Sequence, residues 1–187
     1  SAFQSTGVVN VELNSLTTMY GNNYDSGYQF YGCSKLTHVS MTSATYIKKY
    51  MFQYCSQLIY IDAPIVTEIQ SYAFIGCSLL SNITFPKINS ILDSSFTTDN
   101  NIFELNLPTL KSIGKNTFNN CKGLKSIILE ECTNIGESAF ADCTDLVNIS
   151  LPKLVSLGVS AFQSTGVVNV ELNSLTTMYG NNYDSGY

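Results

Sequence analysis

The sequence predicts a parallel β-solenoid, in which short coils of chain stack on one another around one continuous core. Three observations predict it: phenylalanine recurs at a constant interval, apolar residues fall into fixed columns between the phenylalanines, and prolines follow at one fixed position. Charged residues make up only 12% of the chain and apolar residues 44%. Low charge with many apolar and aromatic residues is the composition of a packed protein rather than a disordered one.

Phenylalanine sets the register of a 22-residue repeat. Its evenly spaced column consists of Phe30, Phe52, Phe74, Phe96, Phe118, Phe140 and Phe162, and Phe3 precedes Phe30 by a longer, 27-residue coil. Counted from each phenylalanine, positions +6, +9, +11, +14 and +17 are apolar in successive coils. One coil alone cannot bury these columns, so neighbouring coils must cover them. We expect seven to eight coils, and seven give a rod about 34 Å long at the usual spacing of parallel strands.

The spacing within each coil predicts its elements. Leu146–Leu151 alternates apolar and polar residues around Ile149, as a half-buried strand does. Prolines follow at position +12, where a strand must end because proline cannot donate to the sheet; they are Pro64, Pro86, Pro108 and Pro152. We therefore expect a parallel sheet on the concave face, and turns, 3-10 or one-turn helices such as Ser138–Phe140 on the other side. No apolar run approaches the roughly 18 residues of a membrane span.

A second, longer repeat is present. Residues 1–28 recur without change at 160–187, which corresponds to a 159-residue unit. Core packing cannot explain identity at exposed positions, where substitutions cost little. The sequence is therefore either a window on an array of such units, which we favour, or the product of a duplicated end. We expect residues 1–187 to form one solenoid that is a fragment of a longer array, since the sequence starts at Ser1 without an initiator methionine.

One coil resembles a known family closely. Ile135–Pro152 reads IGESAFADCTDLVNISLP, which matches the pattern Ile-Gly-x-x-Ala-Phe-x-x-Cys-x-x-Leu-x-x-Ile-x-Leu-Pro of the BspA-like (Treponema pallidum-type) leucine-rich repeat. The resemblance implies a leucine-rich-repeat solenoid and, in function, a surface adhesin that binds host or matrix proteins. Other coils depart from the pattern: Asp99 and Thr165 replace the cysteine, and Ser95 and Thr117 replace the alanine.

Cysteine recurs at position +3. Five cysteines share this column and Cys132 lies in the apolar +14 column; the five are Cys33, Cys55, Cys77, Cys121 and Cys143. Adjacent coils bring such residues within disulfide range, but stacked side chains point the same way, which disfavours bridging. The absence of a C-x-x-C pair excludes the common zinc and redox motifs. The pattern predicts a column of buried free thiols.

Catalytic and metal-binding residues have little support in the sequence. His38 is the single histidine, and no nucleophile motif accompanies it. Asp62 and Glu104 face out of the predicted sheet two coils apart, but a solenoid face provides no cleft to exclude water. Turn chemistry explains Asn22, Asn23 and Asp25 better than calcium binding does. We therefore expect a protein that is not an enzyme and that uses no cofactor or metal.

Two sets of residues are candidates for binding. The first lines the concave strands at positions +8 and +10 and comprises His38, Ser40, Tyr60, Asp62, Asn82, Thr84, Glu104, Asn106, Ser126, Ile128, Asn148 and Ser150. The second comprises Tyr20 and Tyr24 of the inserted segment 20–28, together with Tyr28, Tyr50 and Tyr72, which share position −2. Such tyrosines are typical of an exposed contact stripe, or of a half-buried column that packs on itself.

The sequence thus predicts an extracellular or cell-surface interaction module that binds a protein or a glycan. The alternative is a structural unit of a self-assembling extracellular fibre, because uncapped coil ends expose both core and unpaired strand edges. The net charge of −5 and the lack of arginine disfavour nucleic acid as a partner.

Overall fold

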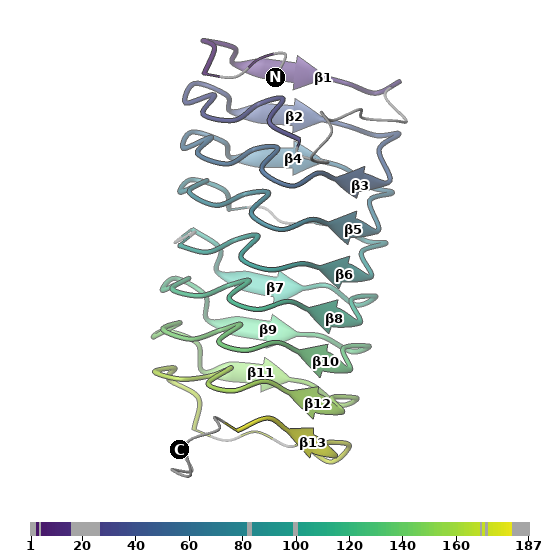
Figure 1. The fold of residues 1–187 in the computed structure, drawn as a ribbon, viewed down its shortest axis with the longest axis vertical. Helices are drawn as coiled ribbons and strands as arrows, with labels where there is room; N and C mark the ends of the chain where they lie inside the picture. The colour runs from purple at the N-terminus through teal and green to yellow at the C-terminus, as the bar shows by residue number, and fades with distance from the viewer. Residues whose placement is uncertain are drawn as a thin grey trace.

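The protein is a stack of coils that runs along one axis, with its two termini at opposite ends (Figure 1). The computed structural model describes residues 3, 5–15, 27–81, 84–98, 101–168, 170 and 172–180. Every strand pairing among them is parallel, and no helix occurs within these ranges. The predicted β-solenoid is confirmed. Within the same ranges, no helix is available that could cross a lipid bilayer.

One face of the stack carries three-residue strands, and we call it the strand face. Its strands form two parallel sheets, ordered β1-β2-β4 and β7-β9-β11. The +9 residues pair in register, as Val39 does with Ile61 and Ile127 with Ile149. The strand expected within Leu146–Leu151 is β11. The strands are β1 (Asn10–Glu12), β2 (His38–Ser40), β4 (Tyr60–Asp62), β7 (Glu104–Asn106), β9 (Ser126–Ile128) and β11 (Asn148–Ser150).

A sheet that the sequence analysis did not predict runs along another face of the stack. We call it the second sheet, because the two three-stranded sheets both belong to the strand face. It has the order β13-β12-β10-β8-β6-β5-β3, and all of its strands except β13 are built from the +16 and +17 positions. Two-residue strands are too short to show an alternating pattern, so only their buried +17 column was visible in the sequence. They are β3 (Tyr46–Ile47), β5 (Glu68–Ile69), β6 (Ser90–Ile91), β8 (Ser112–Ile113), β10 (Asn134–Ile135), β12 (Ser156–Leu157) and β13 (Thr177–Met178).

The one-turn helix that we allowed at Ser138–Phe140 does not form. Ser138 has a φ of 52°, which lies in the left-handed region and cannot continue a right-handed helical turn. The chain passes through turns there instead.

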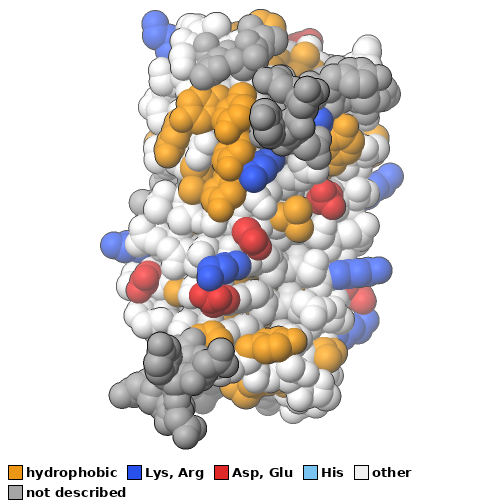
Figure 2. All heavy atoms as spheres, viewed as in Figure 1, with side chains coloured by type: hydrophobic (Ala, Val, Ile, Leu, Met, Phe, Trp, Pro, Cys, Tyr) orange, Lys and Arg blue, Asp and Glu red, His pale blue; other side chains and the backbone are white. Residues whose placement is uncertain are grey.

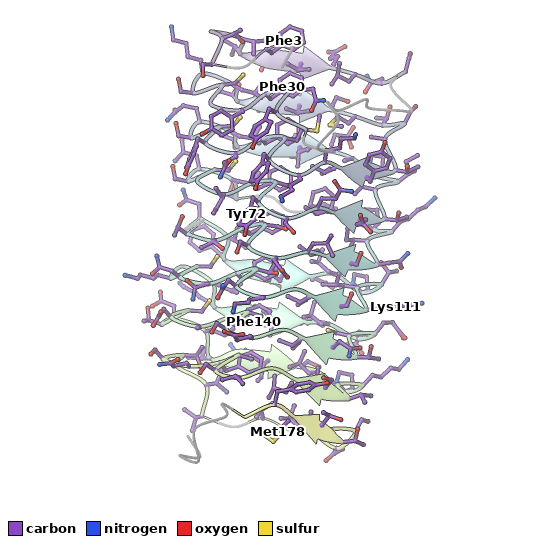
Figure 3. The ribbon with its side chains drawn as sticks, viewed as in Figure 1. Phe3, Phe30, Tyr72, Lys111, Phe140 and Met178 are labelled. Carbon is purple, nitrogen blue, oxygen red and sulfur yellow. The ribbon has the colours of Figure 1, made fainter. Side chains whose placement is uncertain are left out.

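The phenylalanine column forms the centre of the core. Rings from Phe3 to Phe162 stack on one another with centroids 5.0–5.4 Å apart and planes within 12°. Phe30 to Phe140 are at most 1% exposed, and Figure 3 labels Phe3, Phe30 and Phe140 along the stack. Each ring therefore contacts the coil on either side, which ties the burial of one coil to the presence of the next.

Two polar departures from the alanine column, Ser95 and Thr117, are satisfied locally. Ser95 Oγ donates to the carbonyl of Leu92 at 2.5 Å, and Thr117 Oγ1 donates to that of Gly114 at 2.9 Å. Both side chains are fully buried. A buried hydroxyl is tolerated when its hydrogen bond is made.

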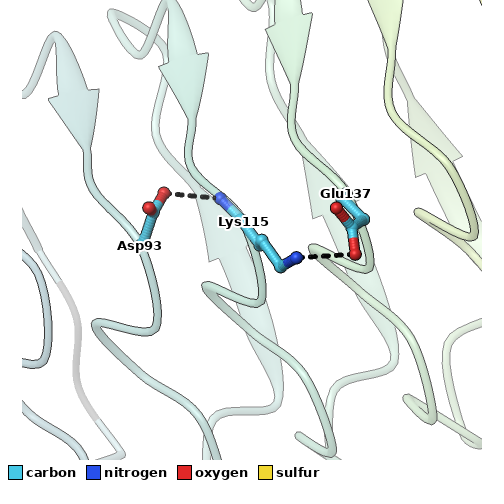
Figure 4. Close-up of polar contacts among 3 residues, drawn as sticks. All are labelled: Asp93, Lys115 and Glu137. Carbon is cyan, nitrogen blue, oxygen red and sulfur yellow. Dashed lines mark hydrogen bonds and ion pairs between the residues drawn. The ribbon is translucent and has the colours of Figure 1, made fainter. Parts of the chain in front are cut away.

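Polar and steric contacts fix one coil relative to the next along a single edge. The Lys115 backbone N–H donates to Asp93 Oδ1 at 2.8 Å, and Lys115 Nζ pairs with Glu137 Oε1 at 2.7 Å (Figure 4). These three residues occupy the same position in three successive coils. At Gly136 a Cβ atom would lie 2.7 Å from backbone atoms of Gly114 and Lys115. Neighbouring backbones therefore approach too closely here for a side chain.

The predicted column of buried thiols is confirmed. All six cysteines are buried, and none of them forms a disulfide. Four donate to the phenylalanine carbonyl of the preceding coil at 3.0–3.2 Å; they are Cys55, Cys77, Cys121 and Cys143. Burial raises the pKa of Cys55 and of Cys143 to about 12. At neutral pH these thiols are protonated structural donors rather than nucleophiles.

Replacing Phe96 by alanine should lower the free energy of unfolding by about 3–5 kcal/mol, because a fully buried ring is lost and a cavity remains. Chemical denaturation measures this difference. Phe103, which is 53% exposed, provides the matched control, and its alanine variant should change stability far less. Equal effects of the two substitutions would contradict the proposed role of the column.

The native protein should resist thiol-specific reagents at pH 8, because all six thiols are buried and burial raises the pKa values of Cys55, Cys132 and Cys143. Ellman's reagent should titrate all six cysteines once the chain is unfolded in guanidinium without reductant. Fewer than six reactive thiols after unfolding would indicate disulfides. Rapid reaction of the folded protein would show that the column is accessible.

Candidate functional site

The strand face brings the predicted concave-face residues into two rows. His38 pairs with Tyr60, and Ser40 with Asp62. In the other sheet the rows continue as Glu104, Ser126 and Asn148, beside Asn106, Ile128 and Ser150. Thr84 is exposed between the two sheets, whereas Asn82 lies outside the described residues. The predicted rows exist, and their role in binding stays a prediction.

Several strand-face side chains hold neighbouring coils together. Ser40 Oγ donates to Asn14 Oδ1 of the preceding coil at 2.6 Å. Thr37 Oγ1 donates to Asn10 Oδ1 at 3.0 Å and lies 2.9 Å from His38 Nδ1. These contacts give the polar groups of this edge a structural role.

The carboxylates considered for acid–base chemistry are not brought into a common pocket. Asp62 lies on β4 and Glu104 on β7, in different sheets. Two depressions, of about 340 and 500 Å³, lie over the second sheet, at β3 and β5 and around β10 and β12. Among the described residues, no three His, Cys, Asp or Glu side chains are grouped as a metal site requires.

Five tyrosines form a second candidate surface. We call it the tyrosine patch: Tyr28, Tyr31, Tyr50, Tyr54 and Tyr72. Tyr50 stacks between Tyr28 and Tyr72, with centroids 4.9 and 5.2 Å away. Tyr31 meets Tyr28 and Tyr54 edge to face at 5.5 and 5.6 Å. Both geometries are favourable for aromatic pairs, so the patch is one connected unit.

The tyrosine patch remains at the surface. Tyr28 is 36% exposed and Tyr54 51%, whereas Tyr31, Tyr50 and Tyr72 are half-buried. Figure 2 shows a continuous group of hydrophobic side chains over the upper coils, and Figure 3, drawn from the same direction, labels Tyr72. The rings therefore pack on one another and stay accessible, and their role as a contact surface stays a prediction.

Three of these tyrosines occupy backbone positions that disfavour large side chains. Tyr50, Tyr54 and Tyr72 have φ values of 62–64°. The same columns in later coils hold Ser94, Asn116, Ser138, Asn120 and Asp142, also at positive φ. Left-handed geometry costs an L-residue about 1–2 kcal/mol, and Asn and Asp offset part of that cost through local hydrogen bonds. The protein thus presents tyrosines where its fold favours small polar residues.

Lysine and glycine complete the surroundings of the patch. Lys49 Nζ lies 4.9 Å from the centre of the Tyr50 ring and 5.6 Å from that of Tyr72, within the range of a cation–π contact. A Cβ on Gly76 would come within 2.8 Å of the Tyr54 ring. Gly76 therefore leaves room for Tyr54 to lie across the next coil.

The sequence identified part of this site. Tyr28, Tyr50 and Tyr72 meet as their shared position predicts, while Tyr20 and Tyr24 lie outside the described residues. Tyr31 and Tyr54 could be recognised in the sequence only as neighbours of this column, and Lys49 was missed. A usable signal was present for Tyr54, because four members of its +2 column are residue types that favour positive φ, namely Gly32, Gly76, Asn120 and Asp142. The other members are Ser5, Thr98 and Ser164.

Comparison with known structures supports the fold. The leucine-rich repeat protein of T. pallidum is 28% identical, with a TM-score of 0.65, and the match covers 82% of this chain and 67% of that protein. A leucine-rich repeat protein from Bacteroides ovatus is 27% identical, with a TM-score of 0.62, over 91% of this chain and 53% of that one. A leucine-rich cell surface protein from Faecalibacterium prausnitzii, at 19% identity and a TM-score of 0.62, shows the fold alone.

The last of these matches covers 92% of this chain and 47% of the other, so the chain spans from about half to two thirds of the length of these proteins. No curated protein sequence matches it. The sequence model of the BspA type leucine-rich repeat region matches residues 1–102 and 67–185, with six copies. Nearly the whole length is therefore accounted for by this repeat, and the chain belongs to the BspA-type leucine-rich repeat family.

Proposed function

We propose that the protein is a non-enzymatic interaction module of the cell surface or extracellular space, and that it binds a protein partner through the tyrosine patch. The observation that carries the proposal is that Tyr50, Tyr54 and Tyr72 are held at left-handed backbone positions. Backbone strain of this kind concentrates at functional sites. Stacking of the rings offsets part of the strain but does not explain why only the coils of Phe30, Phe52 and Phe74 carry tyrosine in these two columns.

The geometry of the patch favours a protein over a glycan. Tyr28, Tyr50 and Tyr72 stack with planes within 12°, so both ring faces of Tyr50 are covered. What remains accessible in the middle of the patch is ring edges and hydroxyl groups. Tyrosine in this form supplies contact area and hydrogen bonds at low entropic cost, as it does in protein interfaces. Lys49 at the patch adds a positive charge suited to an acidic partner segment.

An extracellular location agrees with the thiol chemistry. Free cysteines in an oxidising compartment are exposed to disulfide formation and oxidation when they are accessible. Here all six are buried, and the raised pKa values of Cys55, Cys132 and Cys143 keep them protonated. The family resemblance to surface adhesins points the same way.

Substituting both Tyr50 and Tyr72 by asparagine tests the proposal. Asparagine already occupies this column at Asn116. The substitutions relieve backbone strain and remove ring stacking, so the two effects oppose each other. The free energy of unfolding should therefore change by no more than about 1 kcal/mol. Binding to immobilised extracellular-matrix proteins or to host cells should weaken about 30-fold or more, as at an interface hot spot.

Tyr60 provides the matched control, because it is a half-buried tyrosine of the strand face rather than of the patch. The Tyr60→Asn variant should bind as the parent protein does. Loss of binding in this variant alone would move the site to the strand face. Competition by free glycans, but not by matrix proteins, would show that the partner is a carbohydrate.

A further inference from the structure

One surface column alternates between polar and apolar residues from coil to coil. It lies at position +7, just before the strands of the strand face. We call its members from the Phe30 coil to the Phe140 coil the alternating row: Thr37, Ile59, Ser81, Phe103, Lys125 and Val147. Successive members are spatial neighbours, because the Ile59 N–H donates to the carbonyl of Thr37 at 2.9 Å and the Lys125 N–H to that of Phe103 at 2.8 Å.

The apolar members of the row protrude into solvent. Ile59, Phe103 and Val147 are between 40% and 53% exposed. Each is separated from the next by two coils, which corresponds to about 9.6 Å at the usual spacing of parallel strands. The polar members Thr37 and Ser81 are shorter, so they leave recesses in the row. Core packing does not require this alternation, because the buried +6 and +9 columns are apolar in every coil around it.

A partner that fills such a row must repeat at the same distance of two coils. A second copy of this chain does so, because it carries the same row. Two rows can interlock only when each apolar member faces a polar one. Parallel rows at equal height fail this condition, since Phe103 would meet Phe103 and Lys125 would meet Lys125 of the second copy.

Antiparallel rows meet the condition. A two-fold axis that crosses the row between Ser81 and Phe103 turns the second copy end over end and makes every contact occur twice. It also keeps the residues on one side of the row opposite the same side of the second copy. The pairs across this axis are Thr37 with Val147, Ile59 with Lys125, and Ser81 with Phe103.

Charges beside the row select this register. Position +5 lies two residues before the row, beyond the buried +6 leucines. It holds Lys35 in the Phe30 coil and Asp145 in the Phe140 coil, and both are exposed. The same two-fold axis brings Lys35 of each copy opposite Asp145 of the other. Shifting one copy by two coils keeps the rows interlocked but places Asn101 opposite Lys35, so the complementary charges no longer meet.

We propose that two copies of the chain associate side by side and antiparallel through the alternating row, with Lys35 of each copy paired with Asp145 of the other. Phe103 then lies over Ser81 of the second copy, beside Leu79, which is itself 37% exposed. Opposite Ile59, Lys125 contributes its aliphatic stem, which covers apolar surface while the ammonium group stays in water. The contact uses none of the residues of the tyrosine patch.

Exchanging the two charges tests the register, with the whole chain measured by sedimentation velocity over a range of concentrations. Lys35→Asp places two carboxylates opposite each other, and Asp145→Lys places two ammonium groups opposite each other. Each single variant should therefore weaken dimerisation at least about tenfold. The double variant Lys35→Asp/Asp145→Lys restores opposite charges at both contacts and should dimerise as the parent protein does. A double variant as weak as the single ones would contradict the register.

An apolar position tests the row itself. Phe103→Asp should abolish dimerisation, because a charge would be buried against the second copy. Val155 provides the matched control: it is 39% exposed but lies at position +15, away from the row, so Val155→Asp should dimerise normally. Circular dichroism confirms that each variant is folded. A parent protein that stays monomeric, or equal losses in the two aspartate variants, would overturn the proposal.

The tyrosine patch can be separated from this contact. The variant with both Tyr50 and Tyr72 replaced by asparagine should dimerise as the parent protein does. Loss of dimerisation in that variant would show that copies associate through the tyrosine patch instead of the alternating row.

Discussion

No coil of this protein can bury its own apolar residues, and the rest of the structure follows from that constraint. Each Phe ring between Phe30 and Phe140 has another ring on either side. Four cysteines of the +3 column donate a hydrogen bond to the backbone of the preceding coil. Stability is therefore shared between neighbours, as in other repeat proteins.

Stacking also decides which positions are free to carry function. Columns that face inward must hold similar residues in every coil, whereas the −2 and +2 columns are constrained mainly by their positive φ values. Later coils carry Ser, Thr, Asn and Asp at these positions. The coils of Tyr50, Tyr54 and Tyr72 do not, and their rings join into one patch with Lys49 beside it. This departure from what the backbone favours is the reason for proposing the tyrosine patch as the binding surface.

Much of the fold could be predicted because the spacing of the repeat shows which columns of residues are buried. The apolar columns, the strand at Asn148–Ser150 and the buried thiols all follow from residues repeated at fixed spacing. The second sheet did not follow, since strands such as Ser112–Ile113 are a single residue pair with no alternation to recognise. Ring stacking within the tyrosine column could be anticipated from its spacing, but the edge-to-face contacts of Tyr31 and the position of Lys49 depend on side-chain directions. Hydrophobic periodicity does not show such directions, nor the left-handed backbone positions of their partners Tyr50, Tyr54 and Tyr72.

The stacking constraint is tested most directly by removing one whole coil. Deleting residues 119–140 joins Phe118 to Ala141 and removes one full period of the repeat, so every column stays in register. The account predicts a folded β-protein with a cooperative thermal transition by circular dichroism. Deleting residues 119–129 removes half a period, brings polar positions into the core and should abolish that transition. If the two deletions lost the fold to the same extent, the register between coils would not be what holds this protein together.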